Sequence, residues 1–319
     1  ALTLRGDMYA KTKKETEALQ DFDRVIARWP KEESAAAAWQ RAAQIYAGRQ
    51  DLVNMAKYYE GLIKNFPKAS PAALAEAHFL LGRAAFDQGD FQSSISHMSE
   101  AKTLDPQKYG EQVNVLTVLS YHKLQDVNKL KEALETLQKE NPAAVSRVPD
   151  VIPAWLGLQA YGMKDLETAD KYMTWATQND QLQNVKKVIW RNLAKVRLAL
   201  KKYDRALVAS NNFLKVEDQP YRRADGMLDK ASILLGLGKY ADARKTAEEA
   251  LALGVEGPLM ASLKIVLGDI SYAEKKFDEA AKHYGVTAEL FVNDAELKPK
   301  ALFKAAEALD KACLLYTSD

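Results

Sequence analysis

The hydrophobic and polar positions along this chain repeat as one long phrase, in which small and aromatic residues recur at fixed spacings. The first four copies close at a proline, and Pro30, Pro67, Pro106 and Pro142 stand 37, 39 and 36 residues apart. A phrase of this length has room for two helices, and one helix pair alone cannot bury its apolar side. The pattern therefore predicts helical hairpins that stack on their neighbours in chain order.

The phrase is clearest in its second copy, where the repeating positions hold Trp39, Ala42, Ala43, Tyr46, Met55, Tyr59, Leu62 and Pro67. These spacings resemble the tetratricopeptide repeat, whose pattern reads W-x2-L-G-x2-Y, then A-x3-F-x2-A, then P. The resemblance implies an all-α fold, a right-handed α-solenoid of about eight helix-turn-helix units and a truncated ninth. It further implies one solenoid domain over residues 1–311, with units that start near residues 1, 36, 75, 111, 150, 187, 224, 261 and 298.

Small residues recur where the two helices of a unit must approach each other closely. At the eighth position the units hold Gly6, Ala43, Gly82, Val118, Gly157, Ala194, Ala231 and Gly268. The facing position of the second helix holds Ala18, Met55, Ser94, Leu130, Ala169, Ala206, Ala243 and Ala280. The second helices are predicted to begin at Leu52, Phe91, Val127, Leu166, Tyr203, Tyr240 and Phe277. Permissive backbone in the turns is expected from Gly48, Gly89, Gly162 and Gly238.

Some stretches depart from the family's pattern. The step between units exceeds the family's 34 residues, which implies lengthened helices or loops. The segment from Ala143 to Asp150, with Pro149 and Pro153, reads as an insertion and predicts a bend in the solenoid near residues 143–153. The later units end without the proline, at Gln181, Asp218, Val255 and Val292. The tail, residues 312–319, does not continue the repeat and resembles translated sequencing adapter, so we expect it to be an artefact.

Composition narrows the classes of protein further. Of the 319 residues, 47% are hydrophobic and 28% charged, enough to bury a continuous spine and solvate the outside. The formal net charge of +2 gives no reason to expect a nucleic-acid partner. The sequence contains no run of eighteen apolar residues, so it predicts no transmembrane segment. A single cysteine, Cys313, excludes a disulfide framework within the chain.

Residues that could carry chemistry do not converge in the sequence. His78, His97, His122 and His283 lack the close His/Glu or Cys/Cys spacings of metal sites, so each is interpreted as structural. Gly236 and Gly238 lack the third glycine of a phosphate loop and read as a turn. We therefore predict no catalytic residues, no metal and no cofactor, and expect the chain not to be an enzyme.

The resemblance places the binding surface on the concave wall, which is lined by the first helix of each pair. Applying its positions gives the partner-binding candidates Gln40, Gln44, Phe79, Arg83, Phe86, Val115, Leu119, His122, Arg191 and Lys195. This wall would change from polar through apolar to basic, with an apolar centre suited to an amphipathic helix or an extended apolar segment. The alternative is that some of these side chains pack internally.

A basic stripe lies on one face of a predicted helix. Lys187, Arg191 and Lys195 are spaced four residues apart and could meet a carboxylate or an acidic peptide, or could form a solvated face. Chaperone-binding members of the family hold a terminal carboxylate with lysine, asparagine and arginine side chains. Asp229 stands where that clamp needs an asparagine, so we do not predict chaperone-tail binding.

The leading hypothesis for function is a noncatalytic scaffold that binds a segment of another protein in its concave groove. Phrases such as Asn65 to Ser70, followed by Ala77 to Gly82, look like tetratricopeptide proteins of the bacterial cell envelope. They motivate a periplasmic or envelope-associated interpretation, in which the chain belongs to a peripheral membrane complex. The alternative is a regulatory or recruiting arm of a larger enzyme whose catalytic domain lies outside this sequence. A third interpretation is self-assembly through uncapped end helices.

Overall fold

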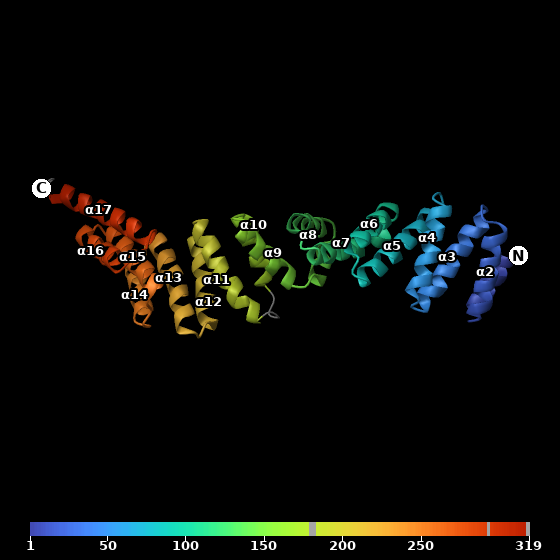
Figure 1. The fold of residues 1–319 in the computed structure, drawn as a ribbon, viewed down its shortest axis with the longest axis horizontal. Coiled ribbons are helices and arrows are strands. Elements are labelled where there is room, and N and C mark those ends of the chain that lie inside the picture. The colour runs from blue at the N-terminus through green and yellow to red at the C-terminus, as the bar shows by residue number, and fades with distance from the viewer. Residues whose placement is uncertain (179–182, 292–293, 317–319) are drawn as a thin grey trace. The chain divides into compact units, whose positions relative to one another are not determined.

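The computed structural model describes residues 1–178, 183–291 and 294–316, and these residues form helices with no strand among them. The chain divides into two compact units, Ala1–Pro149 and Asp150–Asp319. Within each unit the helices pack in chain order, each against the next (Figure 1). The all-α architecture of consecutive helix pairs is as predicted. The single solenoid and its bend concern both units together and stay predictions.

The N-terminal unit contains four helix pairs followed by a short 3₁₀ helix. The pairs are α1 (Leu2–Lys11) with α2 (Glu15–Arg28), α3 (Glu33–Gly48) with α4 (Leu52–Asn65), α5 (Pro71–Asp87) with α6 (Phe91–Leu104), and α7 (Pro106–Lys123) with α8 (Val127–Glu140). The 3₁₀ helix η1 (Pro142–Arg147) packs on α7 and α8. Each predicted proline follows the end of a second helix within two residues, where it cannot continue the helix.

The C-terminal unit continues the same order. Its helices are α9 (Val151–Gly162) with α10 (Leu166–Ala176), α11 (Gln183–Ala199) with α12 (Tyr203–Val216), α13 (Pro220–Gly236) with α14 (Tyr240–Leu251), α15 (Gly257–Ala273) with α16 (Phe277–Leu290), and finally α17 (Leu297–Tyr316). Helix α17 packs against α16. The predicted unit ends at Gln181 and Val292 lie outside the described residues, as do residues 317–319 of the tail.

The second helices begin where the sequence predicts. All seven expected residues, from Leu52 to Phe277, are the first residues of their helices. The aspartates before four of them act as caps, because each side chain accepts the backbone N–H three residues later; these are Asp51, Asp90, Asp126 and Asp165. The first helices α3, α5, α7, α11, α13 and α15 are 16 to 18 residues long, so lengthened first helices contribute to the step above 34 residues.

Each turn inside a pair uses one residue with a positive φ, two positions before the second helix. Gly89 and Gly238 fill this position with φ of 84° and 72°. The prediction for Gly48 and Gly162 was wrong, because both end their first helices without a positive φ. In the other turns the left-handed residue is a lysine or glutamine, namely Lys13, Gln50, Gln125, Lys164, Lys201 and Lys275.

The core consists of the predicted small residues and the side chains that pack on them. All eight residues at the eighth position and all eight at the facing position are buried, Val118 among them. Four residues further along the second helix lie the fully buried Phe22, Tyr59, Met98, Leu134, Met173, Ser210, Ala247 and Tyr284. In six of these eight pairs a large side chain of the second helix therefore fills the space beside the first helix, whereas Ser210 and Ala247 are small.

Polar links also join neighbouring helix pairs. The partners of each link lie 34 to 36 residues apart, about one repeat along the chain, so the same kind of contact recurs through both units. The links are Asp23–Tyr58, Glu15–Arg49, Gln40–Glu76, Glu167–Lys202, Arg244–Glu279 and Asp269–Lys304. These hydrogen bonds and ion pairs are part-buried or exposed, and one of them ties the buried Tyr58 to Asp23.

Candidate binding surfaces on the first helices

The first helices present one face that their own second helices leave uncovered. We call it the first-helix face and define it by the repeat positions of Gln40, Gln44 and Ala47. At the last two of these positions every first helix from α1 to α17 carries a half-buried or exposed side chain. This contrasts with the eighth position, which is buried in all eight complete helix pairs. The face is therefore a continuous series of accessible side chains within each unit.

The two glutamines of α3 are bound to a neighbouring helix. Gln40 Nε2 donates to one carboxylate oxygen of Glu76 on α5 at 2.7 Å, and Gln44 Nε2 donates to the other at 2.8 Å. The hydroxyl of the buried Tyr59 lies 3.3 Å from the same carboxylate. Glu76 is a residue that the sequence reasoning did not single out. It fixes the amide groups of both glutamines, so a partner would meet a preformed polar cluster here.

The two phenylalanines of α5 pack partly within the chain. The ring of Phe79 stacks on Tyr109 of α7, with ring centroids 4.7 Å apart, and contacts the buried cluster around Met98. Phe86 packs edge-on against Phe91 of the same pair, at 5.4 Å. Both side chains remain half-buried. Phe79 therefore serves the contact between α5 and α7, and its role in binding a partner stays a prediction.

The remaining candidates of the N-terminal unit lie on α5 and α7. Arg83 is exposed and forms no ion pair with any described residue. Val115, Leu119 and His122 on α7 are half-buried. Burial lowers the pKa of His122, with a smaller contribution from Lys123. This part of the face offers an apolar strip beside one accessible cation.

The basic stripe of the C-terminal unit is paired with an acidic stripe. Lys187 and Arg191 form ion pairs with Asp218 and Asp225, the latter on α13. Lys195 Nζ lies 3.9 Å from Asp229 Oδ2, also on α13. The prediction of a basic surface is therefore corrected, because each of its cations has a carboxylate partner in the same chain. The signal was present in the sequence as acidic residues 31 to 34 positions further on.

Asp229 is the unusual member of these pairs. Its side chain is 14% exposed, and among the described residues no hydrogen bond reaches its Oδ2 atom. Burial raises its pKa to about 6, an effect that Asp225 adds to and that Lys195 and Arg191 oppose. A raised pKa means that the folded chain holds this proton more tightly than the unfolded chain does. The free energy of unfolding therefore falls as the pH rises from the ordinary aspartate pKa to about 6.

Replacing Asp229 with asparagine removes the charge that the fold disfavours. We expect Asp229→Asn to raise the free energy of unfolding by about 2 kcal/mol at pH 7.5, because one pKa unit corresponds to about 1.4 kcal/mol. At pH 4 the two proteins should be nearly equal in stability. Urea unfolding at both pH values checks this, with Asp218→Asn as the control, because that carboxylate is exposed and paired with Lys187. A variant no more stable than wild type at pH 7.5 would contradict the assignment.

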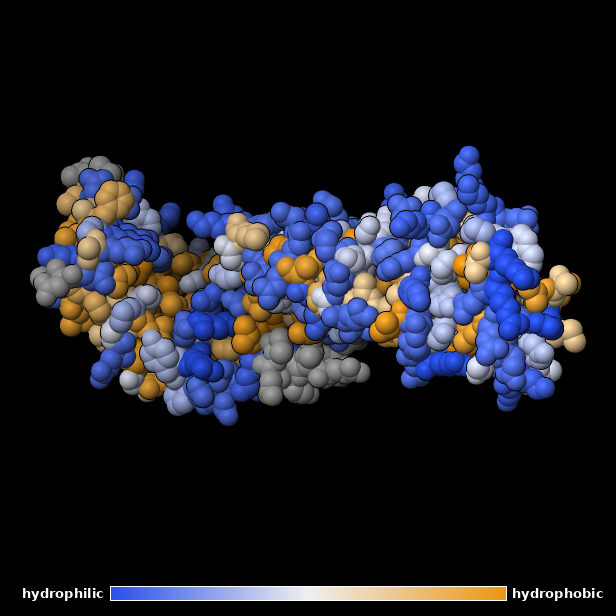
Figure 2. Space-filling model, turned by 45° about the vertical axis from the view of Figure 1, so that its right-hand side comes forward, coloured by the Kyte–Doolittle hydropathy of each residue, from blue (hydrophilic) through white to orange (hydrophobic). Residues whose placement is uncertain are grey.

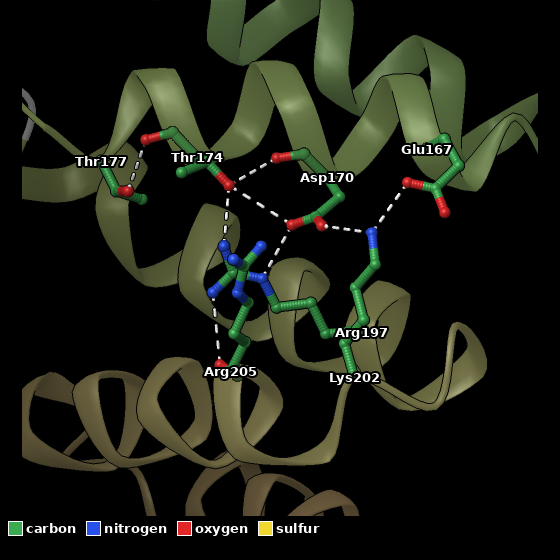
Figure 3. Close-up of polar contacts among 7 residues, drawn as sticks. All are labelled: Glu167, Asp170, Thr174, Thr177, Arg197, Lys202 and Arg205. Atoms are coloured by element: carbon green, nitrogen blue, oxygen red, sulfur yellow. Dashed lines mark hydrogen bonds and ion pairs between the residues drawn. The ribbon is translucent and has the colours of Figure 1, made fainter.

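A buried polar cluster ties α10, α11 and α12 together behind the first-helix face (Figure 3). Arg197 Nε donates to Asp170 Oδ1 at 2.7 Å, and both side chains are only 9% exposed. Arg197 also donates to the hydroxyl of Thr174 and to the carbonyl oxygen of Arg205. Lys202 donates to the second oxygen of Asp170 at 3.0 Å. Burial alone would raise the pKa of Asp170, but the hydrogen bonds from Arg197 and Lys202 lower it below its usual value.

The histidines form one pair that the sequence did not predict. His78 Nδ1 on α5 lies 3.0 Å from His97 Nδ1 on α6, and both rings are half-buried. Burial lowers the pKa of both imidazoles, so one neutral ring donates to the other. Among residues 1–178, 183–291 and 294–316, no three His, Cys, Asp or Glu side chains are grouped so that they could hold a metal ion.

Several hydrophobic side chains are exposed on the last helix. Helix α17 leaves Leu302, Phe303 and Leu309 between 50% and 67% exposed. Figure 2 shows hydrophobic surface at the C-terminal end, whereas hydrophilic atoms cover most of the N-terminal unit in the same view. Considering the described residues alone, we find no helix with the length and apolar character needed to cross a membrane.

Comparisons with known proteins agree with this architecture. Models of the tetratricopeptide repeat match residues 75–108 and 228–289. No curated protein matches the chain. A solved structure of Naa15/Naa10 bound to HypK-THB is similar, with 15% identity, a TM-score of 0.51, and coverage of 86% of this chain and 39% of that one.

Two further solved structures are similar at lower scores. Yeast Tom70 has 16% identity and a TM-score of 0.41, over 95% of this chain and 61% of that chain. A tetratricopeptide repeat protein from Parabacteroides merdae has 16% identity and a TM-score of 0.37, over 85% and 98%. The chain thus spans less than two thirds of the Tom70 and Naa15/Naa10 chains that it matches.

The family models match helix pairs in both units, α5 with α6 and most of α13 to α16. In the pairs outside these matches, the same repeat positions are buried and the second helices begin at the same position. Residues 75–108 and 228–289 are therefore tetratricopeptide repeats, and the other helix pairs share their buried positions and helix starts.

Proposed function

We propose that this chain is a noncatalytic scaffold that binds a segment of another protein along its first-helix face. The tetratricopeptide repeats support a role in protein–protein interaction. The observation that carries the proposal is the contrast within each helix pair. The second helix buries one side of the first helix completely, whereas the first-helix face stays accessible from one pair to the next.

The N-terminal unit carries the more favourable part of this face. Val115 and Leu119 supply half-buried apolar surface, and Phe86 extends it onto the neighbouring helix. Arg83 stands beside them without a described ion-pair partner. Apolar anchors next to one accessible cation suit an amphipathic helix or an extended segment that carries a carboxylate. In the C-terminal unit, Arg191 and Lys195 are already neutralised, so that part of the face suits polar contacts.

Selected peptides provide the test. Peptides that bind the wild-type chain would be isolated from a random display library, and their affinity measured for Arg83→Glu with Leu119→Ser. We expect the affinity to fall at least about tenfold, because the variant removes an accessible cation and an apolar anchor. Phe79 is left unchanged, because its ring packs on Tyr109 and its loss would disturb α5 and α7.

The matched control changes one cation and one aliphatic residue on a second helix. Val53 and Lys64 on α4 are both exposed, so Val53→Ser with Lys64→Glu should leave the affinity unchanged. Far-UV circular dichroism shows whether both double variants keep the helix content. Peptides that bind the Arg83→Glu/Leu119→Ser variant as tightly as wild type would reject the first-helix face as the binding surface.

The place of action is a narrower part of the proposal. The envelope assignment rests on the phrases at Asn65 to Ser70 and Ala77 to Gly82. Recovering the reading frame around this sequence tests it. A lipoprotein signal upstream would support an envelope scaffold in a peripheral membrane complex, and an adjoining catalytic domain would instead support the recruiting arm of an enzyme.

A further inference from the structure

A hollow of about 570 Å³ lies between α12, α13 and α14 in the C-terminal unit. It is lined by Asn211, Leu214, Lys215, Arg223, Met227, Lys230, Thr246 and Glu249. None of these residues occupies a position of the first-helix face. The volume lies within the range of ligand pockets, roughly 300–1,000 Å³. The hollow is therefore a separate surface with room for a short segment of another molecule.

The lining of this hollow carries an excess of positive charge. Lys215, Arg223 and Lys230 contribute three cations, and Glu249 is the one acidic residue among them. Within the described part of the chain, neither lysine forms an ion pair. Arg223 is held by backbone oxygens instead, because its Nη1 donates to the carbonyl groups of Leu214 at 2.6 Å and Glu217 at 3.2 Å. Its charge is thus fixed in place without a carboxylate to neutralise it.

A similar hollow lies at the same place of the repeat in the N-terminal unit. The residues that line the two hollows differ in charge. The N-terminal hollow, about 260 Å³ between α6, α7 and α8, has Asn114 and Thr117 at the repeat positions of Met227 and Lys230. Its Lys102 donates to Glu140 at 2.7 Å and to Asn114 at 2.9 Å, so this charge is satisfied internally. Its second cation, Lys129, lies over the ring of Tyr121 and lines the hollow together with Glu132. The space thus recurs with the repeat, whereas the larger excess of cations, three beside one acidic residue, belongs to the hollow at α12–α14.

We propose that the hollow between α12, α13 and α14 binds an acidic peptide segment of a partner protein. Lys215 and Lys230 would pair with carboxylates of the segment, since neither has a competing partner in the chain. Leu214 and Met227 offer apolar contact for its side chains, and Asn211 can bind its backbone. Glu249 and this apolar floor favour a peptide over a nucleic acid, whose backbone carries a negative charge at every phosphate. The proposal does not depend on the first-helix face.

The test uses two labelled peptides and one double variant. In the first peptide glutamate alternates with leucine, and in the second glutamine replaces each glutamate. Fluorescence anisotropy should show that the glutamate peptide binds the wild-type chain and that Lys215→Gln with Lys230→Gln weakens binding at least about tenfold. The glutamine peptide should bind no better than the glutamate peptide binds the variant. Affinity should also fall as salt is raised, since salt screens partly exposed charges.

A matched control removes the same charge elsewhere in the unit. Lys201 and Lys282 are exposed and form no ion pair among the described residues, so Lys201→Gln with Lys282→Gln should bind as wild type. Glutamine is compatible with the turn at Lys201, because Gln50 and Gln125 occupy the same left-handed position. The proposal is overturned if the glutamate peptide does not bind, or if it binds the Lys215→Gln/Lys230→Gln variant as well as wild type. Tighter binding of a thymidine oligonucleotide that requires both lysines would also overturn it, in favour of nucleic acid.

Discussion

Replacing Arg197 with methionine is expected to lower the free energy of unfolding by about 3 kcal/mol at pH 7. The substitution removes the guanidinium that pairs with Asp170 and leaves its carboxylate buried. Arg197 binds Asp170, Thr174 and the backbone of Arg205 at once, and so connects α10, α11 and α12 (Figure 3). Lys202 still contacts Asp170 in this variant, which keeps the cost at the lower end of the range for broken buried pairs. Urea unfolding followed by circular dichroism measures the change.

The pH dependence and a double variant separate this effect from general damage. The lowered pKa of Asp170 stabilises the fold above the pKa of the unfolded chain, and this stabilisation is lost as the pH falls through the lowered value. The difference between wild type and Arg197→Met should therefore shrink in acid. Asp170→Leu combined with Arg197→Met should recover most of the lost stability, since apolar side chains can replace a buried pair. A cost below about 1 kcal/mol for Arg197→Met alone would show that the cluster contributes little.

Gly268→Ala is expected to destabilise the chain by about 3 kcal/mol, because one methyl group has no room against the facing helix. A Cβ atom on Gly268 would lie 2.4 Å from Cε1 and 2.7 Å from Cδ1 of Tyr284. This ring is buried, and its hydroxyl donates to Asp269 at 2.6 Å, so it cannot move aside without losing that hydrogen bond. Thermal and urea unfolding of the variant measure the cost.

Gly82→Ala is the matched comparison at the same repeat position. Its Cβ would approach His97 Cβ and two atoms of Met98 at 3.2 Å, a contact that the flexible methionine can relieve. Alanine also favours a helix over glycine by about 1 kcal/mol. We expect Gly82→Ala to leave stability within about 1 kcal/mol of wild type. Equal effects of Gly82→Ala and Gly268→Ala would contradict this account of the close helix approach.

The fold was predictable because its determinants are local and recur. The same geometry recurs in every copy, with small residues such as Gly6, Gly82 and Gly268 and helix starts such as Leu52 at the same positions. Aligning one copy with the repeat pattern therefore assigns the positions of all the others. The turns were less predictable. A lysine or glutamine that adopts a positive φ cannot be recognised from its residue type. Gly48 and Gly162 suggest the left-handed position of the turn, but neither residue occupies it.

The candidate surfaces were less predictable than the fold. The frame compares the same position in successive units, but Gln40 and Gln44 bind Glu76, which stands at a different position of the next unit. Arg191 likewise meets Asp225 across a helix interface. The ring of Phe79 packs against α7 because neighbouring first helices share a contact that hydrophobic periodicity within one helix does not reveal. Which of these side chains bind a partner stays a prediction.

The polar links that recur about one repeat apart have a mechanical consequence. The apolar clusters run from one helix pair into the next, and links such as Glu15–Arg49 and Arg244–Glu279 add polar contacts between pairs at exposed or half-exposed positions. Dissolved ions screen exposed charges far more than they affect apolar packing. Higher ionic strength should therefore weaken only the polar share of the contacts between neighbouring pairs, so each unit becomes more compliant while its apolar packing keeps the pairs together.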